Sequence, residues 1–471
     1  MKRLKIVALA FVMLFGAFSC DEALDINTDP LVATAADPNA VLPYVFVQYS
    51  ARKVTELGTR ICDVSQYISN TFNSPNRGAT SIFLTGNTWG MMYVQVLGNL
   101  ALVVADAEEA GATSNNIAAM AKVVQAVIYY ELTSIWEEVP FTEAIDGQEF
   151  PSPTFDSQEV VLNGVVGLLD EAMTLIDTRE TNGEFNVSVG DMIYGGDMAK
   201  WRILANSMKL RTLMMLRSGG AAVDAQINTA LGQPLMTDNS DAAFLAYGTA
   251  PGAQNGMHTI ITAFFGPDNE SQDVFGPGDP IDALLNGSGD PRWDNWVARN
   301  DLEAPGNDVF PDPTTSVLSN NVIRPDAPDI WMTPDEIDLY KAELAIAGGF
   351  TGLSSAQSHY EDGVTNSLEW WGQDIPGVLG SISAAEVTAY VGSLGAVTLQ
   401  RVQEEQYLAA FLHPVLAWNH VRRTGVPALS APPASSISSI LMRFNYPPNE
   451  VAANPNTPAN LDTDVRMWFQ P

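Results

Sequence analysis

The sequence predicts a predominantly α-helical protein made of stacked helix pairs, with an irregular, loop-rich lobe packed alongside. The first observation is a stretch from 115 to 144 whose apolar side chains recur at helical spacing over about five turns. The second is that the segment from 245 to 330 loses this periodicity and is dominated by Gly, Pro, Asn and Asp. With 471 residues and 46% hydrophobic content, the chain can bury a large core.

The stretch from 115 to 144 is the segment on which we expect the other helices to pack. The apolar stripe along it consists of Ile117, Met120, Ala121, Val124, Ile128, Leu132 and Ile135. The neighbouring flank is also mostly apolar, so this helix is expected to be covered on two sides. Asn115 or Asn116 is expected to cap its start, and Pro140 prevents a regular continuation.

Further amphipathic helices are predicted before and after this stretch. Their expected ranges are 40–69, 88–110, 156–178, 191–217, 332–349, 359–372, 384–393 and 399–429. Thr333 is expected to cap the helix at 332–349, and Glu336 to complete a capping box. We therefore divide the mature chain into a helical core (41–245), an irregular ligand-binding lobe (246–330) and a continued helical core with a Pro-rich end (331–471).

The N-terminus has the pattern of a secreted, lipid-anchored protein. Residues 1–19 combine a basic start with a short apolar run, which is typical of a removable signal peptide. Cys20 is the expected lipidation site, and residues 20–40 form a tether; the alternative is a plain signal peptide followed by a structural cysteine. Cys62 is expected to be a buried thiol. No later stretch reaches about 18 uninterrupted apolar residues.

The charge balance excludes a nucleic-acid partner. The chain has 55 acidic and 23 basic residues, and three of the basic ones lie in the expected signal peptide. Phosphate binding needs clustered Lys and Arg, which this balance does not favour. Direct docking on an anionic membrane surface is disfavoured for the same reason.

The segment 191–217 holds a concentration of basic residues in this acidic chain. They are Lys200, Arg202, Lys209, Arg211 and Arg217. One interpretation is an anion site. We favour ion pairs with carboxylates that fix the geometry between helices. Asp197 is expected to cap the helix within this segment.

Three groups of residues form motifs along the chain. The first comprises Ala121, Lys122, Ala126, Tyr129, Leu132, Trp136, Val139, Pro140, Phe141, Glu143 and Ala144. The second comprises Tyr194, Gly196, Asp197, Lys200, Trp201, Ala205, Asn206, Ser207, Lys209 and Arg211. The third comprises Ala417, Trp418, the run 422–427, the run 443–450 and Asn454. Together they resemble the SusD/RagB family, most closely its branch with a compact, Pro-rich C-terminus, although members usually carry Gly where this chain has Glu137.

The resemblance implies a particular fold, location and partner. The helix pairs should resemble tetratricopeptide repeats, and the protein should be an outer-membrane lipoprotein exposed at the cell surface. Its partner should be a SusC-like TonB-dependent outer-membrane transporter, to which it delivers an oligosaccharide or an oligopeptide. Asp21 and Glu22, directly after Cys20, resemble the acidic signal that sends such lipoproteins to the surface.

Two loops, 69–88 and 255–277, have the composition of a ligand site. They combine aromatic side chains with Asn, Asp and Arg, which suit sugars and extended peptides. The resemblance places ligand contacts in the same two regions. The candidate ligand-binding residues are Phe72, Asn73, Asn76, Arg77, Phe83, Phe264, Phe265, Asn269 and Phe275. The alternative for each is ordinary loop packing.

No catalytic motif is present, so we expect a binding protein and not an enzyme. The sequence contains no nucleophile elbow, HExxH pair, P-loop, dinucleotide fingerprint or CxxC. One alternative is an all-α glycan hydrolase that uses carboxylates such as Glu137. Another is an accessory subunit of the transporter that binds no ligand itself.

No cofactor is expected, with Ca²⁺ as the one candidate metal. The acidic residues that crowd one region and could hold it are Asp273, Asp279, Asp282, Asp290 and Asp294. Their spacing does not match an EF-hand. His413 and His420 share a helix but lack an identifiable third ligand, so packed imidazoles are favoured over a metal site.

Overall fold

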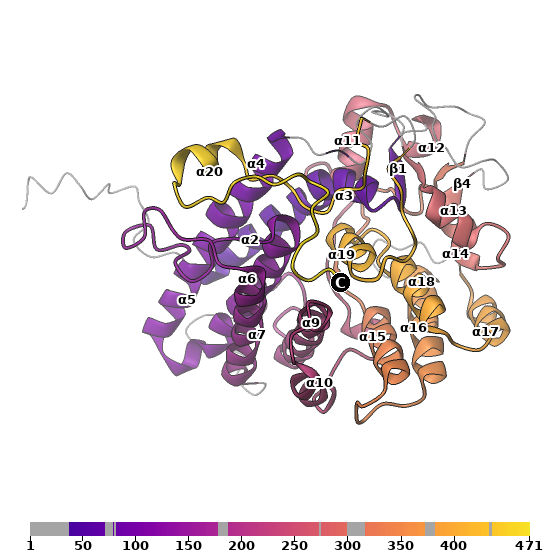
Figure 1. Ribbon diagram of the computed structural model, residues 1–471, viewed down its shortest axis with the longest axis horizontal. Coiled ribbons are helices and arrows are strands. Elements are labelled where there is room, and N and C mark those ends of the chain that lie inside the picture. Colours follow the sequence, from indigo (N-terminus) through magenta and orange to yellow (C-terminus); the bar gives the residue numbers. More distant parts are fainter. Residues whose placement is uncertain are drawn as a thin grey trace, which may run out of the picture. The chain divides into compact units, whose positions relative to one another are not determined.

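Helices dominate the computed structural model, which describes residues 37–70, 79, 82–177, 187–272, 275–298, 316–372, 382–432 and 436–471. Residues Pro38–Pro471 form one compact unit, and of the other unit, Met1–Asp37, only Asp37 is described. Cys20, the expected signal peptide and most of the tether therefore lie outside the described residues. Figure 1 follows the described elements along the chain.

The helices confirm the predicted fold class. The first group is α2 (Pro38–Arg52), η1 (Lys53–Leu57), α3 (Gly58–Val64), α4 (Ile82–Gly90), η3 (Met91–Leu97), α5 (Gly98–Ala110), η4 (Ala112–Ser114), α6 (Asn115–Trp136), α7 (Gln158–Leu175), α8 (Val187–Gly190), α9 (Met198–Ser218) and α10 (Asp224–Leu231). The middle group is η5 (Asn239–Asp241), α11 (Gly256–Phe264), α12 (Asn269–Gln272), α13 (Asp279–Leu285) and α14 (Pro291–Trp296). The last group is α15 (Pro334–Ala347), α16 (Ala356–Gly372), α17 (Ala384–Ser393), α18 (Leu399–Ala409), α19 (Pro414–Thr424) and α20 (Pro448–Ala453).

Consecutive long helices pack against one another as pairs. α6 lies between α5 and α7, and α7 packs in turn on α9. A second set is formed by α15, which packs on both α16 and α18. Figure 1 shows the first set in purple and magenta and the second in orange, and contacts between α9 and α15 join them. The predicted stack of helix pairs is therefore confirmed.

The helix α6 is buried along most of its length, as its two apolar flanks predict. From Asn116 to Trp136 its residues are buried, apart from Lys122 and one glutamine. The predicted cap is wrong, because Ser114 precedes the helix and makes no side-chain capping bond. Asn116 instead holds the backbone of Asp177, donating to its carbonyl at 2.9 Å and accepting from its N–H at 2.8 Å.

The basic residues of α9 tie neighbouring helices together. Three pair with carboxylates on other helices: Lys209 with Asp170 at 2.5 Å, Arg211 with Glu336 at 2.5 Å, and Arg217 with Asp224 at 3.0 Å. Two donate to backbone carbonyls: Lys200 to Ser240 at 2.6 Å and Arg202 to Ile176 at 2.8 Å. The prediction of inter-helix ion pairs is therefore confirmed for three of the five residues. Asp197 caps α9 as predicted, accepting from two N–H groups of its first turn.

The predicted capping box at the start of α15 is wrong. Thr333 makes no side-chain capping bond, although it does precede the helix. Glu336 turns instead to Arg211, whose Nε and Nη2 donate to its two carboxylate oxygens. A bidentate, charge-assisted pair is stronger than a hydrogen bond to one backbone N–H. Glu336 therefore binds Arg211 and does not cap its own helix.

Two hydrophobic cores share the helices α15 and α19. The first core fills the space among the helices from α2 to α10, and α15 contributes Ile337 and Leu344 to it. The second core lies among the segments from α11 to α18, and Leu339 of the same helix belongs to it. Likewise, Trp418 of α19 enters the first core and Val421 the second. Because two helices face both cores, the predicted lobe is packed onto the helices that follow it.

Three two-stranded antiparallel sheets occur among the described residues. They pair β1 (Ile68–Asn70) with β3 (Phe275–Pro277), β2 (Ala243–Leu245) with β6 (Asp329–Met332), and β4 (Val297–Ala298) with β5 (Val317–Leu318). The β1–β3 and β2–β6 sheets join segments that lie far apart in the chain, whereas β4 and β5 lie at the two ends of one connection. The first two sheets therefore fix the ends of parts of the irregular region.

One described helix, Thr85–Ala110, is long and apolar enough to cross a membrane by length and composition. Its residues Met92, Val96 and Leu100 are fully buried in the first core. Core helices pass the same length and hydropathy test as membrane spans. The contacts that this helix makes with α2 and α6 identify it as a core helix.

Gly278 allows the closest backbone approach behind the β1–β3 sheet. A Cβ at this position would lie 1.8 Å from the carbonyl oxygen of Gln66, and the Gly278 N–H donates to Tyr67 O at 3.1 Å. We predict that Gly278→Ala lowers the free energy of unfolding by about 2 kcal/mol or more, because backbone has to move to admit the methyl group. Urea denaturation followed by circular dichroism measures this change.

The matched control is Gly167→Ala in α7, where a Cβ meets nothing within 4 Å. Alanine in a helix interior is expected to raise stability by up to about 1 kcal/mol. Equal stability of the Gly278→Ala variant and the unmodified chain would contradict the close approach.

Candidate ligand-binding face

The two predicted ligand loops meet at one small sheet. In the β1–β3 pair, Asn70 lies opposite Phe275. The loop 69–88 leaves β1 at Asn70, and the segment 255–277 enters β3 at Phe275, so one end of each loop is held next to the other. The sequence analysis missed this pairing because a three-residue strand is too short to show alternation.

The segment 255–277, expected to be a loop, is partly helical. Asn255 caps α11, accepting from the Met257 N–H at 2.9 Å, and its amide donates to Ala327 O at 2.9 Å. Met257 and Ile261 point into the second core. The capping Asn and the spacing of four between these apolar residues were the available signals, outweighed by the surrounding Gly and Pro.

Phe264 presents an exposed aromatic face at the end of α11. Its side chain is 78% exposed, while the adjacent Phe265 is half-buried against the second core. The two ring centroids lie 6.5 Å apart, with the rings tilted by 54°. Thr259 and Thr262 of the same helix are also exposed, but their hydroxyl groups donate to backbone carbonyls within the helix. An exposed aromatic ring such as that of Phe264 can cover the apolar face of a sugar.

Asn269 and Phe275 shape this region from within. Asn269 is fully buried, and its amide donates to Phe275 O at 3.0 Å and to Leu318 O at 2.7 Å while accepting from the Phe275 N–H at 2.9 Å. Phe275 is 3% exposed and belongs to the second core. Both side chains are used for packing, so neither presents a surface for direct ligand contact.

The structure does not describe the side chains of the remaining candidate ligand-binding residues. Phe72, Asn73, Asn76 and Arg77 fall outside the described residues. Phe83 lies in α4, but its side chain is outside the description. Ligand contact by these residues stays a prediction.

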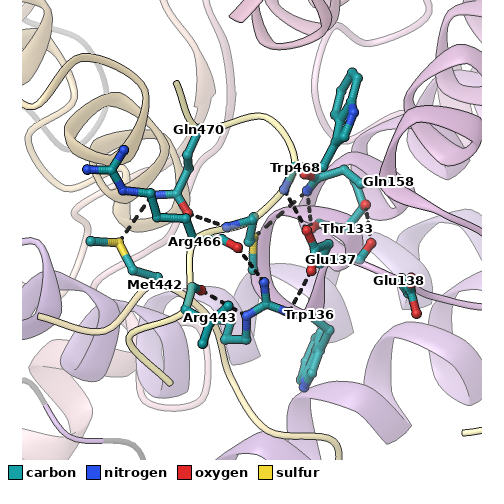
Figure 2. Close-up of polar contacts among 12 residues, drawn as sticks. Thr133, Trp136, Glu137, Glu138, Gln158, Met442, Arg443, Arg466, Trp468 and Gln470 are labelled. Carbon is teal, nitrogen blue, oxygen red and sulfur yellow. Dashed lines mark hydrogen bonds and ion pairs between the residues drawn. The ribbon is translucent and has the colours of Figure 1, made fainter. Parts of the chain in front are cut away.

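Glu137, the candidate acid of the hydrolase alternative, anchors the C-terminal segment. Its Oε2 pairs with Arg443 Nη1 at 2.5 Å, and its Oε1 accepts from the Trp468 N–H at 2.5 Å. Figure 2 shows these bonds converging on Glu137, whereas Glu138 points away from them. With both oxygens occupied, Glu137 is poorly placed for proton transfer.

Glu137 also ends α6 in an unusual backbone conformation. Its φ of 73° lies in the left-handed region, which favours Gly. This explains how a position where SusD/RagB members usually carry Gly can end the helix, and the bonds to Arg443 and Trp468 offset the strain of a larger residue.

Metal binding finds no support in the described part of the chain. There, no group of three or more His, Cys, Asp or Glu residues could hold a metal ion. Of the proposed calcium ligands, Asp290 is paired with Arg292 at 2.6 Å, and Asp273 lies outside the described residues.

The two histidines of the α19 region are packed, as predicted. His413 donates from Nε2 to Trp331 O at 2.8 Å, and burial together with nearby Lys53 lowers its pKa well below the usual value. Burial and the charge of Arg423 lower the pKa of His420 to about 3. Both imidazoles are therefore neutral at physiological pH. Cys62 is the buried thiol that the sequence predicts.

A family model described as "Starch-binding associating with outer membrane", of the SusD-like type, matches residues 33–447. The chain belongs to the SusD-like family. A comparison with curated protein sequences gives no match. The resemblance inferred from the motifs is thereby confirmed.

Solved SusD-like structures share the fold of this chain. A chitin-binding protein superposes with a TM-score of 0.76 at 19% identity, covering 92% of this chain and 100% of its own. A chitin-binding SusD homologue from Flavobacterium johnsoniae gives 0.74 at 18% identity, covering 92% and 98%. A SusD homologue from Bacteroides uniformis gives 0.73 at 19% identity, covering 92% and 99%. At these identities the similarity establishes the fold.

The contrast between Phe264 and Phe275 is testable by stability alone. Phe275→Ala should lower the free energy of unfolding by about 3 kcal/mol or more, because it leaves a cavity in the second core. Phe264→Ala should change it by less than about 0.5 kcal/mol, because the ring is exposed. Chemical denaturation of both variants checks this, and a large loss for Phe264→Ala would mean that the ring is part of the packing.

Proposed function

We propose that this SusD-like protein captures an oligosaccharide at the cell surface and delivers it to a partner TonB-dependent outer-membrane transporter. The observation that carries the proposal is the exposed aromatic ring of Phe264 at the end of α11. The loop 69–88 starts at β1, which pairs with β3 at the end of the segment that carries Phe264. Four of the candidate ligand residues in this loop lie outside the described residues.

The related proteins favour a glycan over a peptide. The family description names starch binding, and two of the solved relatives are described as chitin-binding. Aromatic rings and hydroxyl groups serve both ligand classes, so peptide binding is a possible result of the test below.

The tether supports capture at the membrane. Acyl chains on Cys20 would hold the protein on the outer membrane, and the acidic residues after it match a surface-directing signal. A SusC-like barrel is the proposed recipient of the ligand. The second candidate function is an accessory subunit that binds no ligand. A glycan hydrolase that uses Glu137 is disfavoured, because both carboxylate oxygens of Glu137 are bonded to Arg443 and to the Trp468 N–H.

We predict that glycans stabilise the mature chain from Asp21 against heat. A thermal-shift screen uses plant, fungal and bacterial glycans and peptide digests, each with and without Ca²⁺. Binding raises the free energy of unfolding by about 2.7 kcal/mol when the free ligand is at about a hundred times Kd, and it therefore raises the melting temperature in a concentration-dependent way. Phe264→Ala should weaken binding about tenfold, because stacking on one ring contributes on the order of 1 kcal/mol.

Val189→Ala is the matched control for Phe264→Ala. Val189 of α8 is 63% exposed, lies in neither predicted loop and lines neither the hollow at Tyr390 nor the hollow at Ile145. If only the peptide digests raise the melting temperature, the ligand is a peptide and not a glycan. If neither the glycans nor the peptides raise it, the accessory role without a ligand is favoured.

A further inference from the structure

Away from the face that carries Phe264, a hollow opens between the turn after α13 and the helices α14 and α17. Its volume is about 500 Å³, within the range of roughly 300–1,000 Å³ that small-molecule sites occupy. None of its lining residues belongs to α11, α12, β1 or β3. It is therefore separate from the face that carries Phe264.

One wall of this hollow is an aromatic ring beside buried charges. The half-buried Tyr390 of α17 lies close to Asp290, and burial together with the charge of Asp290 raises the pKa of the Tyr390 hydroxyl. Asp290 pairs with Arg292 at 2.6 Å, and Arg292 reaches Glu405 of α18 at 2.5 Å. Arg292 is fully buried, so this network is a rigid base. A ring held in place before binding loses little entropy when a ligand covers it.

The charge of Asp290 is maintained by this network. Burial alone would raise the pKa of Asp290, but the charge and hydrogen bonds of Arg292 outweigh it and lower the pKa below the usual value. Asp290 is therefore a carboxylate at neutral pH, and it lies beside the Tyr390 hydroxyl at the side of the hollow.

The rim of the hollow consists of hydrogen-bond acceptors. The carboxyl groups of Asp294 and Glu386 line it and are exposed, and Oε2 of Glu386 already accepts from Ser383 in the capping box of α17. The turn next to them contains Gly287 and Gly289 with φ of 75° and 80°. Glycine is favoured at such angles, and it leaves the backbone of the turn uncovered. No Lys or Arg lines the hollow. Carboxylates accept hydrogen bonds from hydroxyl and ammonium groups and repel anions.

We propose that this hollow is a second carbohydrate subsite, which takes a sugar ring presenting hydroxyl or amino groups against Tyr390 and excludes acidic sugars. The inference rests on the proposed glycan capture and specifies neutral or amino sugars as the ligands. Trp293 also lines the hollow and is buried. Two separated subsites would let the protein hold an extended chain at two points, which raises its overall affinity.

The test fills the hollow without touching the core. Ala389 lines it and is exposed, so Ala389→Trp should block it while the chain still folds. Ala385→Trp, one turn earlier and exposed on the same helix but not in the lining, is the matched control. Isothermal titration uses the mature chain with three probes: chitosan hexaose, N-acetylchitohexaose and hexagalacturonate.

The expected result is that Ala389→Trp weakens binding of chitosan hexaose or N-acetylchitohexaose at least about tenfold, whereas Ala385→Trp binds like the unmodified chain. Hexagalacturonate should bind the unmodified chain most weakly of the three. Normal binding by Ala389→Trp together with a loss in Phe264→Ala would overturn the second subsite and leave the proposed function standing. Equal binding of hexagalacturonate would overturn the exclusion of acidic sugars, and no binding of any probe to the unmodified chain would overturn the subsite outright.

Discussion

The fold depends on a buried polar network centred on Trp331 of β6. The Trp331 carbonyl accepts from Arg211 of α9 at 3.1 Å and from His413 before α19 at 2.8 Å. Its indole N–H donates to Asp329 at 3.0 Å, and Asp329 pairs with Lys53 of η1 at 3.1 Å. Buried charges destabilise a protein unless each is paired, so four segments remote in sequence have to meet in one geometry. Helix packing alone would allow more than one relative placement of these segments.

Buried polar networks of this kind also support the two surfaces that we propose bind sugars. β6 pairs with β2, and the segment between these strands carries α11 with the exposed Phe264. A second buried network around Arg292 supports Tyr390 in the same way. Of the side chains proposed to face a ligand, Phe264 is exposed and Tyr390 is half-buried, while the charges of the supporting networks are buried. Such an arrangement lets loops vary in sequence without disturbing the scaffold.

Sequence reasoning succeeded where the physical cause is local. The apolar spacing of α6 and the range of α17 follow from neighbouring residues, and the family motifs identified the fold. The predicted capping box was wrong because its cause is distant in sequence. Glu336 pairs with Arg211, which is 125 residues away, and so does not cap its own helix. Composition marked Asn269 and Phe275 as ligand residues, but composition does not reveal that a side chain is buried. The hollow at Tyr390 needs α14 and α17 to meet, which no local pattern encodes.

The most direct test of glycan capture is a crystal structure of the mature chain soaked with N-acetylchitohexaose. Our account predicts sugar rings stacked on Phe264, with a further ring against Tyr390 between α14 and α17. A different site is available for comparison, since a hollow of about 520 Å³ lined by Val94 and Ile145 lies elsewhere on the chain. Sugar bound there, with Phe264 and Tyr390 uncovered, would contradict the account.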